Sequence, residues 1–320
     1  MHDAPLGPLD GVPVSIKDLL LTKGWPTRRG SKTVDPAGPW PDDAPAVARL
    51  RESGAVLFGK NTTPEFGWKG VTDSALNGIT RNPWNLSKTP GGSSGGGAAA
   101  VAAGIGPLTI GTDGGGSIRI PCSFTGIFGL KPSFGRVPAW PLSPFGTVAH
   151  LGPMARTVGD AALMLNVIAQ PDARDWYALP FDGHDYREAI DEGVDGWRIA
   201  YSATLGHAAV DPEIAAIVER AALRFAELGA HVEEIDLRFD GVDEIFRRHW
   251  FSGAASLLRH FTAEQKALID PGLIEVADQG ARIGMLELIE AAQHRAALGA
   301  KMNLFHHTYD LLVTDRKSVV

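Results

Sequence analysis

The chain has 320 residues, of which 44% are hydrophobic and 21% are charged, and this composition supports a large folded core rather than a disordered chain. The formal net charge of −7 argues against a general binder of nucleic acids or of anionic membranes. A single cysteine, Cys122, excludes an internal disulfide framework and a cysteine-rich zinc site. No apolar run reaches the roughly 18 residues of a membrane helix and no signal peptide is visible, so we expect a cytoplasmic protein.

The predicted elements alternate between strand and helix along the chain. Apolar runs bounded by turn residues predict strands over residues 12–17, 55–58, 108–112, 197–201, 231–237 and 309–314. Helical spacing of apolar residues predicts helices over residues 44–53, 97–103, 117–125, 157–169, 211–228, 244–261 and 285–307. This alternation predicts an α/β fold in which helices cover a mostly parallel or mixed sheet. No linker composition interrupts the pattern, so we expect one domain.

Many of the 38 glycines gather in two short segments, GGSSGGG at residues 91–97 and GTDGGGS at residues 111–117. Glycines 114–116 leave the backbone free to turn several N–H groups toward one point, which is the form expected of an oxyanion hole. Ser117 follows at the start of a predicted helix, where its hydroxyl could attack a carbonyl. Taken alone, however, the segment is more typical of a glycine-rich turn with Ser117 as a helix N-cap.

A serine nucleophile requires a base, and two kinds of base can be considered. None of the ten histidines has a telling sequence context, and no Gly-x-Ser-x-Gly elbow contains Ser117. Lys17 ends a mainly apolar strand, and burial there would lower its pKa. A lysine that acts as a base near neutral pH needs a pKa about 3 units below its usual value of about 10.4, whereas a solvated strand-end lysine is commoner.

A phosphate-binding loop built on residues 91–97 is a further reading of the first glycine segment. Such a loop requires Lys-Ser or Lys-Thr directly after its last glycine. Three alanines, residues 98–100, follow instead. The sequence therefore disfavours a phosphate-binding module.

Considered together, the two glycine segments resemble a known pattern. Residues 91–97 and 111–122 (GTDGGGSIRIPC) resemble the signature of the amidase signature family, including the 24-residue step from Ser93 to Ser117. Residues 7–18 (GPLDGVPVSIKD), 126–136 and 152–157 (GPMART) match as well. The resemblance is continuous over about residues 7–170 and weaker beyond them.

The resemblance implies a three-layer α/β/α fold with a central mixed sheet, and a Ser–Ser–Lys triad that uses neither a metal nor a cofactor. On this interpretation Ser117 is the nucleophile, Ser93 relays its proton, and Lys17 is the base. A cis peptide bond between Gly92 and Ser93 is also implied. The backbone N–H groups expected to form the oxyanion hole are those of Gly114, Gly115, Gly116 and Ser117. The residues expected to support Lys17 and the loop are Ser94, Thr112, Asp113 and Arg119.

The resemblance also implies an activity, namely hydrolysis of a carboxylic amide through an acyl-serine intermediate. Two alternatives stay open: the glutamine-hydrolysing component of a tRNA-dependent amidotransferase (its GatA-type chain), and a non-catalytic truncated fragment. Residues 140–150 look more like stand-alone amidases than like that component. As partners we expect a small-molecule amide substrate, no nucleic acid and no membrane, and we retain a homodimer as a candidate assembly.

Both ends of the chain depart from the family pattern. We interpret residues 1–314 as one partial amidase domain, truncated at both ends, with a catalytic core over about residues 7–170. Residues 315–320 (DRKSVV) match the translation of a common sequencing adapter. We therefore expect these six residues to be a non-native tail.

Overall fold

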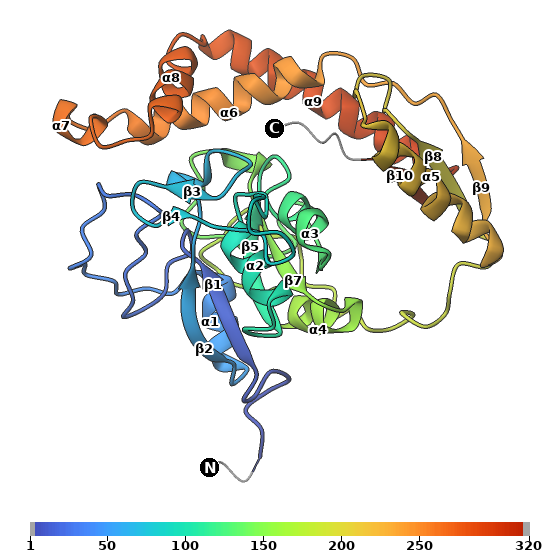
Figure 1. The fold of residues 1–320 in the computed structure, drawn as a ribbon, viewed down its shortest axis with the longest axis horizontal. Helices are drawn as coiled ribbons and strands as arrows, with labels where there is room; N and C mark the ends of the chain where they lie inside the picture. The colour runs from blue at the N-terminus through green and yellow to red at the C-terminus, as the bar shows by residue number, and fades with distance from the viewer. Residues whose placement is uncertain (1–3, 316–320) are drawn as a thin grey trace. The chain divides into compact units, whose positions relative to one another are not determined.

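The computed structural model describes residues 4–315, and Figure 1 shows their fold. The chain divides into two compact units. The first contains the residues up to Glu188 together with Phe251–Ala281, and the second contains Ala189–Trp250 and the residues from Arg282 onward. That residues 1–314 form one domain stays a prediction, and residues 316–320 of the predicted tail lie outside the described residues.

A five-stranded mixed sheet forms the centre of the first unit, in the order β2-β1-β5-β7-β6. Figure 1 labels β2, β1, β5 and β7 of this sheet. Its first strand β1 pairs in parallel with both β2 and β5, whereas β7 is antiparallel to β5 and to β6. The strands are β1 (Pro13–Lys17), β2 (Val56–Asn61), β5 (Leu108–Asp113), β6 (Phe128–Gly129) and β7 (His150–Ala155). This arrangement confirms the predicted α/β fold with a central mixed sheet.

Helices cover both faces of this sheet. Helices α1 (Pro45–Glu52) and α4 (Val158–Ile168) pack on one face, where Val14, Ile16 and Leu50 belong to the main apolar core. Helices α2 (Gly95–Ala102) and α3 (Arg119–Thr125) pack together beside the strands, with a smaller buried cluster that contains Ala98, Ile118, Cys122 and Met154. Because side chains alternate along a strand, Val14 and Ile16 lie on one face of β1 and Lys17 lies on the other.

Shorter elements complete the first unit. They are the 3-10 turns η1 (Glu65–Gly67) and η2 (Gly146–Val148), the hairpin of β3 (Asp73–Ser74) and β4 (Gly78–Ile79), and the helices α7 (Ala263–Lys266) and α8 (Pro271–Gly280). Neither α8 nor strand β7 is among the elements predicted above.

The second unit has a three-stranded parallel sheet in the order β10-β8-β9. Its strands are β8 (Arg198–Ser202), β9 (His231–Glu234) and β10 (Leu311–Thr314), and its long helices are α5 (Pro212–Glu227) and α9 (Met285–Phe305). Helix α6 (Val242–Leu258) begins in this unit and ends in the first. Within residues 4–315, no helix is both long enough and apolar enough to span a membrane.

The start of helix α3 differs from the prediction. We expected the helix to begin at Ser117, but it begins at Arg119. The N–H groups of Ile118 and Arg119 donate to the carboxylate of Asp113, at 3.1 and 3.3 Å. Asp113 thus satisfies the free donors at this helix end, and Ser117 stays in the loop rather than acting as an N-cap.

Candidate active site

Lys17 lies at the carboxyl end of β1 and is 1% exposed. Its Nζ donates hydrogen bonds to Ser93 Oγ at 2.7 Å, Ser94 Oγ at 2.9 Å and Thr112 Oγ1 at 2.8 Å. Burial lowers the pKa of Lys17 to about 7, against a smaller upward effect of the Asp113 charge. Lys17 therefore has a substantial neutral fraction near pH 7, and a neutral amine can accept a proton from a bonded hydroxyl.

Ser93 and Ser94 are buried where the chain enters α2, and the Gly92–Ser93 peptide bond is cis. A Cβ atom at residue 92 would lie 2.7 Å from the carbonyl carbon of Val71, so the backbone approach there requires a glycine. Ser94 donates its N–H to the Ser117 carbonyl oxygen at 3.1 Å. This bond connects the loop around Ser93 to the loop that carries Ser117.

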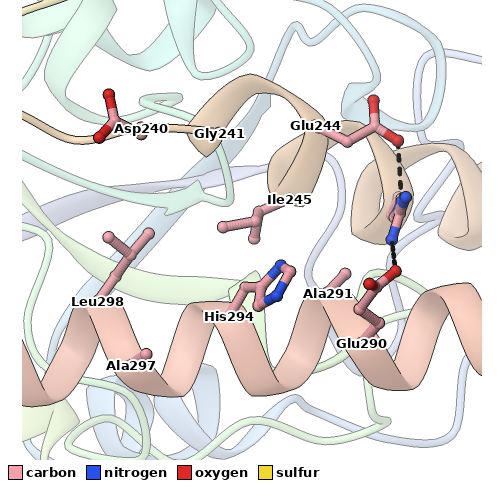
Figure 2. Close-up of a pocket in the computed structure, with 10 residues that line it drawn as sticks. Asp240, Gly241, Glu244, Ile245, Glu290, Ala291, His294, Ala297 and Leu298 are labelled. Carbon is pink, nitrogen blue, oxygen red and sulfur yellow. Dashed lines mark hydrogen bonds and ion pairs between the residues drawn. The ribbon is translucent and has the colours of Figure 1, made fainter.

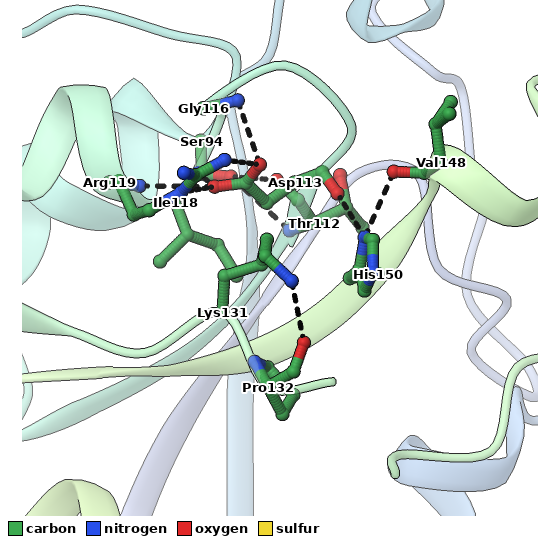
Figure 3. Close-up of polar contacts among 10 residues, drawn as sticks. All are labelled: Ser94, Thr112, Asp113, Gly116, Ile118, Arg119, Lys131, Pro132, Val148 and His150. Atoms are coloured by element: carbon green, nitrogen blue, oxygen red, sulfur yellow. Dashed lines mark hydrogen bonds and ion pairs between the residues drawn. The ribbon is translucent and has the colours of Figure 1, made fainter. Parts of the chain in front are cut away.

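The loop at residues 114–117 is organised by the buried carboxylate of Asp113, the last residue of β5. Asp113 accepts the Gly116 N–H at 2.7 Å and two bonds from the Arg119 guanidinium, at 2.9 and 3.0 Å (Figure 3). Burial pushes the pKa of Asp113 upward, but the bonds and charge of Arg119 and the backbone N–H donors outweigh it and lower the pKa to about 2. Asp113 and Arg119 thus hold the loop through hydrogen bonds.

The four N–H groups predicted to form the oxyanion hole differ in their hydrogen bonding. The Gly116 N–H points at Asp113 Oδ1, so it is already engaged. Across residues 4–315, the N–H groups of Gly114, Gly115 and Ser117 find no acceptor. Three of the four expected donors are therefore without an acceptor in the described part of the chain.

Some of the predicted site residues are hydrogen-bonded to one another through their side chains, whereas Ser117, across the residues that the structure describes, is not bonded to them in this way. Lys17, Ser93, Ser94 and Thr112 are in direct contact. Ser117 is 7% exposed, and within the described part of the chain no hydrogen bond joins its hydroxyl to that of Ser93. The hydrogen bond found between Ser117 and this group, among residues 4–315, is the one that its backbone carbonyl accepts from the Ser94 N–H.

The structure also shows the burial and the contacts of several other residues in the first unit. Phe66 and Phe145 are buried side chains. Cys122 is buried against Gly129, and burial together with the Asp113 charge raises the pKa of its thiol to about 12. His150 received no role from the sequence, yet its ring contacts the carbonyl of Asp113 (Figure 3).

A separate hollow of about 420 Å³ lies in the second unit, between the start of α6 and the middle of α9 (Figure 2). Its main polar contacts are internal, since Arg248 bonds to both Glu244 and Glu290. None of the predicted site residues lines it. Figure 2 shows no serine among the lining residues, so this hollow is not a second candidate for the same chemistry.

Comparison with known proteins decides the family. The profile described as Amidase matches residues 2–318. The chain belongs to the amidase signature family. The family's structures agree in fold: a bacterial aryl acylamidase of the amidase signature enzymes has a TM-score of 0.88 and 33% identity, covering 99% of this chain and 69% of that one. The GatA-type chain of the glutamyl-tRNA(Gln) amidotransferase from Thermotoga maritima has a TM-score of 0.80 and 29% identity, covering 97% of this chain and 70% of that one.

Two curated relatives with different names are similar to this chain. An acylamidase of Rhodococcus erythropolis is 40% identical over 317 residues, which are 97% of this chain and 65% of that protein. The GatA-type chain of the glutamyl-tRNA(Gln) amidotransferase from Syntrophus aciditrophicus is 42% identical over 230 residues, which are 72% of this chain and 47% of that protein. The chain thus spans just under two thirds of the acylamidase and about half of the amidotransferase component.

Proposed function

We propose that this protein hydrolyses the C–N bond of a carboxylic amide through an acyl intermediate on Ser117. The observation that carries the proposal is the buried Lys17, whose lowered pKa and 2.7 Å contact with Ser93 suit it to receive a proton. The free N–H groups beside Ser117 support it, because they can hold the oxyanion that an attacked carbonyl develops.

The proposed reaction begins with proton transfer. Ser117 Oγ attacks the amide carbon while its proton passes to Ser93, whose own proton passes to Lys17. The N–H groups of Gly114, Gly115 and Ser117 stabilise the tetrahedral oxyanion. Lys17 then returns the proton through Ser93 to the leaving nitrogen, the C–N bond breaks, and acyl-Ser117 remains. Water attacks the acyl group by the same relay and releases the carboxylic acid.

A fluorophosphonate probe tests the nucleophile, because it forms a stable covalent bond with an activated serine. We expect labelling of the wild-type chain and none of Ser117→Ala. The matched control is Ser123→Ala, an exposed position on α3, which should label as the wild type does. Equal labelling of wild type and Ser117→Ala would refute the assignment of the nucleophile.

Lys17→Ala tests the base. Removal of a general base costs about 10²–10⁴-fold in rate, so we expect a loss in that range for amide hydrolysis. A loss below about tenfold would argue that Lys17 is structural. Circular dichroism and a thermal melt of the variant separate loss of chemistry from loss of fold.

A second candidate function is glutamine hydrolysis as the GatA-type chain of an amidotransferase, favoured by the 42–44% identity to such chains. The acylamidase relative favours a stand-alone amidase, because its similarity extends over 97% of this chain. A substrate panel that includes an anilide and glutamine distinguishes the two. Turnover of glutamine with none of the anilide would favour the second candidate, and a folded chain that neither labels nor turns over any amide would favour a non-catalytic fragment.

A further inference from the structure

His150 faces the nucleophile loop from the neighbouring strand. It is the first residue of β7 and pairs with Asp113, the last residue of β5. Its Nδ1 lies 3.1 Å from the Asp113 carbonyl oxygen and 2.9 Å from the Val148 carbonyl oxygen (Figure 3). The Phe134 ring packs edge-on against the imidazole, with centroids 5.8 Å apart. The ring is thus held by two carbonyl contacts at Nδ1 and by the packing of Phe134.

The two contacts determine which nitrogen carries hydrogen. Carbonyl oxygens only accept hydrogen bonds, so Nδ1 must be protonated and act as the donor to both. Burial, with the charge of Lys131 adding to it, lowers the pKa of His150 and outweighs the opposite effect of Asp113. A neutral ring with its hydrogen on Nδ1 leaves Nε2 as the basic nitrogen.

The position of the Asp113 carbonyl also determines the direction of the next N–H. In a trans peptide the C=O and the following N–H point in opposite directions, and the Asp113–Gly114 bond is not among the cis bonds of this chain. A donor that holds the Asp113 oxygen therefore fixes the Gly114 N–H in the opposite direction within the same peptide plane. That N–H has no acceptor within residues 4–315.

The Asp113 side chain does not perform this task. Its carboxylate is occupied by Arg119 and by the N–H groups of Gly116 and Ile118. Those bonds hold the far end of the loop. At its near end, Asp113 is held by the strand pairing with His150 and by the contact of the His150 ring with the Asp113 carbonyl.

We propose that His150 is a positioning residue for the oxyanion hole: its Nδ1–H fixes the Asp113 carbonyl and thereby aims the Gly114 N–H at the developing negative charge. This inference rests on the proposed function, in which Ser117 is the acylated residue. Preorganised donors of this kind act mainly in the transition state, so their loss lowers kcat more than it raises KM.

Three substitutions of His150 distinguish the effect of its Nδ1–H hydrogen bond from the effect of its packing. His150→Asn places an amide N–H near the position of Nδ1, His150→Gln places one near Nε2, and His150→Phe keeps the packing against Phe134 without a donor. We expect kcat, or the rate of fluorophosphonate labelling, to fall about 10–100-fold for the Phe and Gln variants, with KM within about twofold. The Asn variant should stay within about threefold of wild type. Equal rates for Asn and Gln, or an unchanged rate for Phe, would overturn the inference.

Two further measurements distinguish a failure of this inference from a failure of the proposed function. If wild type and Ser117→Ala label equally, the proposed function fails, whatever His150 does. Nitrogen-15 NMR of the wild-type chain reads the His150 tautomer without any reaction. We expect hydrogen on Nδ1, and hydrogen on Nε2 alone would overturn the inference even if the variants fail to fold.

Discussion

At the residue scale, Lys17 should set the pH dependence of the reaction. Only the neutral amine accepts a proton, and burial lowers the pKa of Lys17 to about 7. We expect kcat/KM to fall about tenfold per pH unit below pH 7 and to level off above it. A pH–rate profile of amide hydrolysis checks this expectation, and a rate that is flat from about pH 5 to 8 would contradict it.

The lowered pKa of Lys17 should also make the free energy of unfolding depend on pH. The folded-state pKa of about 7 lies below the unfolded value of 10.5, so between these values the unfolded chain binds the extra proton. The free energy of unfolding should therefore rise with pH across this window, by at most about 1.4 kcal/mol per unit from this group. Below pH 7 the folded state bears the full cost of a buried charge.

Denaturant titrations of wild type and Lys17→Met at several pH values measure this slope. Lys60 has a pKa lowered to about 8, chiefly by burial, and contributes a similar slope in both proteins. The difference between the two proteins isolates Lys17. A slope unchanged by the substitution would show that Lys17 is not buried as a titrating amine.

Most of the site's contacts with Lys17 were predictable, and one feature of the loop was not. The resemblance assigned Lys17, Ser93, Ser94 and Thr112 to one cluster, and these side chains are in contact. The engagement of the Gly116 N–H was missed because it depends on the backbone turn at Gly116, with φ of 110°, and on the Asp113 carboxylate that reaches it. Sequence spacing does not specify such a turn.

At the element scale, helix α2 approaches the neighbouring chain segment so closely that it requires a glycine. A Cβ atom at residue 96 would lie 2.5 Å from the Thr62 nitrogen and 2.6 Å from its carbonyl oxygen. We expect Gly96→Ala to lower the free energy of unfolding by about 1–3 kcal/mol, because backbone atoms must move.

The matched control is Gly159→Ala in α4, where no atom lies within 4 Å of the added methyl group. Alanine favours helix over glycine, so this variant should be neutral or more stable by up to about 1 kcal/mol. Urea unfolding of both variants provides the comparison. Equal effects of the two substitutions would contradict the role assigned to the close approach at Gly96.

The accuracy of the predicted elements follows from how local their signals are. Helix α5 was placed to within a residue or two, because Asp211 caps it, Pro212 begins it and Gly229 follows its end. Strand β7 was missed because Gly152 and Pro153 usually interrupt strands, whereas here they pair with β5. That pairing joins residues about 40 positions apart in the sequence. A local sequence pattern therefore cannot predict it.

At the scale of the whole molecule, the two units differ in how much of their helices they bury. Helix α4 buries six residues along its length, whereas α5 buries Ala222 alone and α9 buries Ala291 alone. Apolar side chains on these helices are exposed, at 46% for Ile217, 55% for Leu223 and 76% for Leu286. Since buried apolar area provides most of the stability of a helix in a protein, α5 and α9 should open more readily than α4.

Hydrogen exchange read by mass spectrometry measures this difference. We expect amides of α5 and α9 to exchange at least about tenfold faster than those of α4, and limited proteolysis to cut first within residues 189–250 or 282–315. Equal protection of α4 and α5 would contradict the expectation.

The buried Cys122 has a practical consequence for spectroscopy. It is the single cysteine of the chain, it is packed inside the first unit, and its pKa of about 12 keeps it as an unreactive thiol at neutral pH. A cysteine introduced at an exposed position, such as Ser87→Cys, would then be the one thiol that a maleimide dye or spin label reaches. Distances and motions could be followed site by site while the native thiol keeps its place in the core.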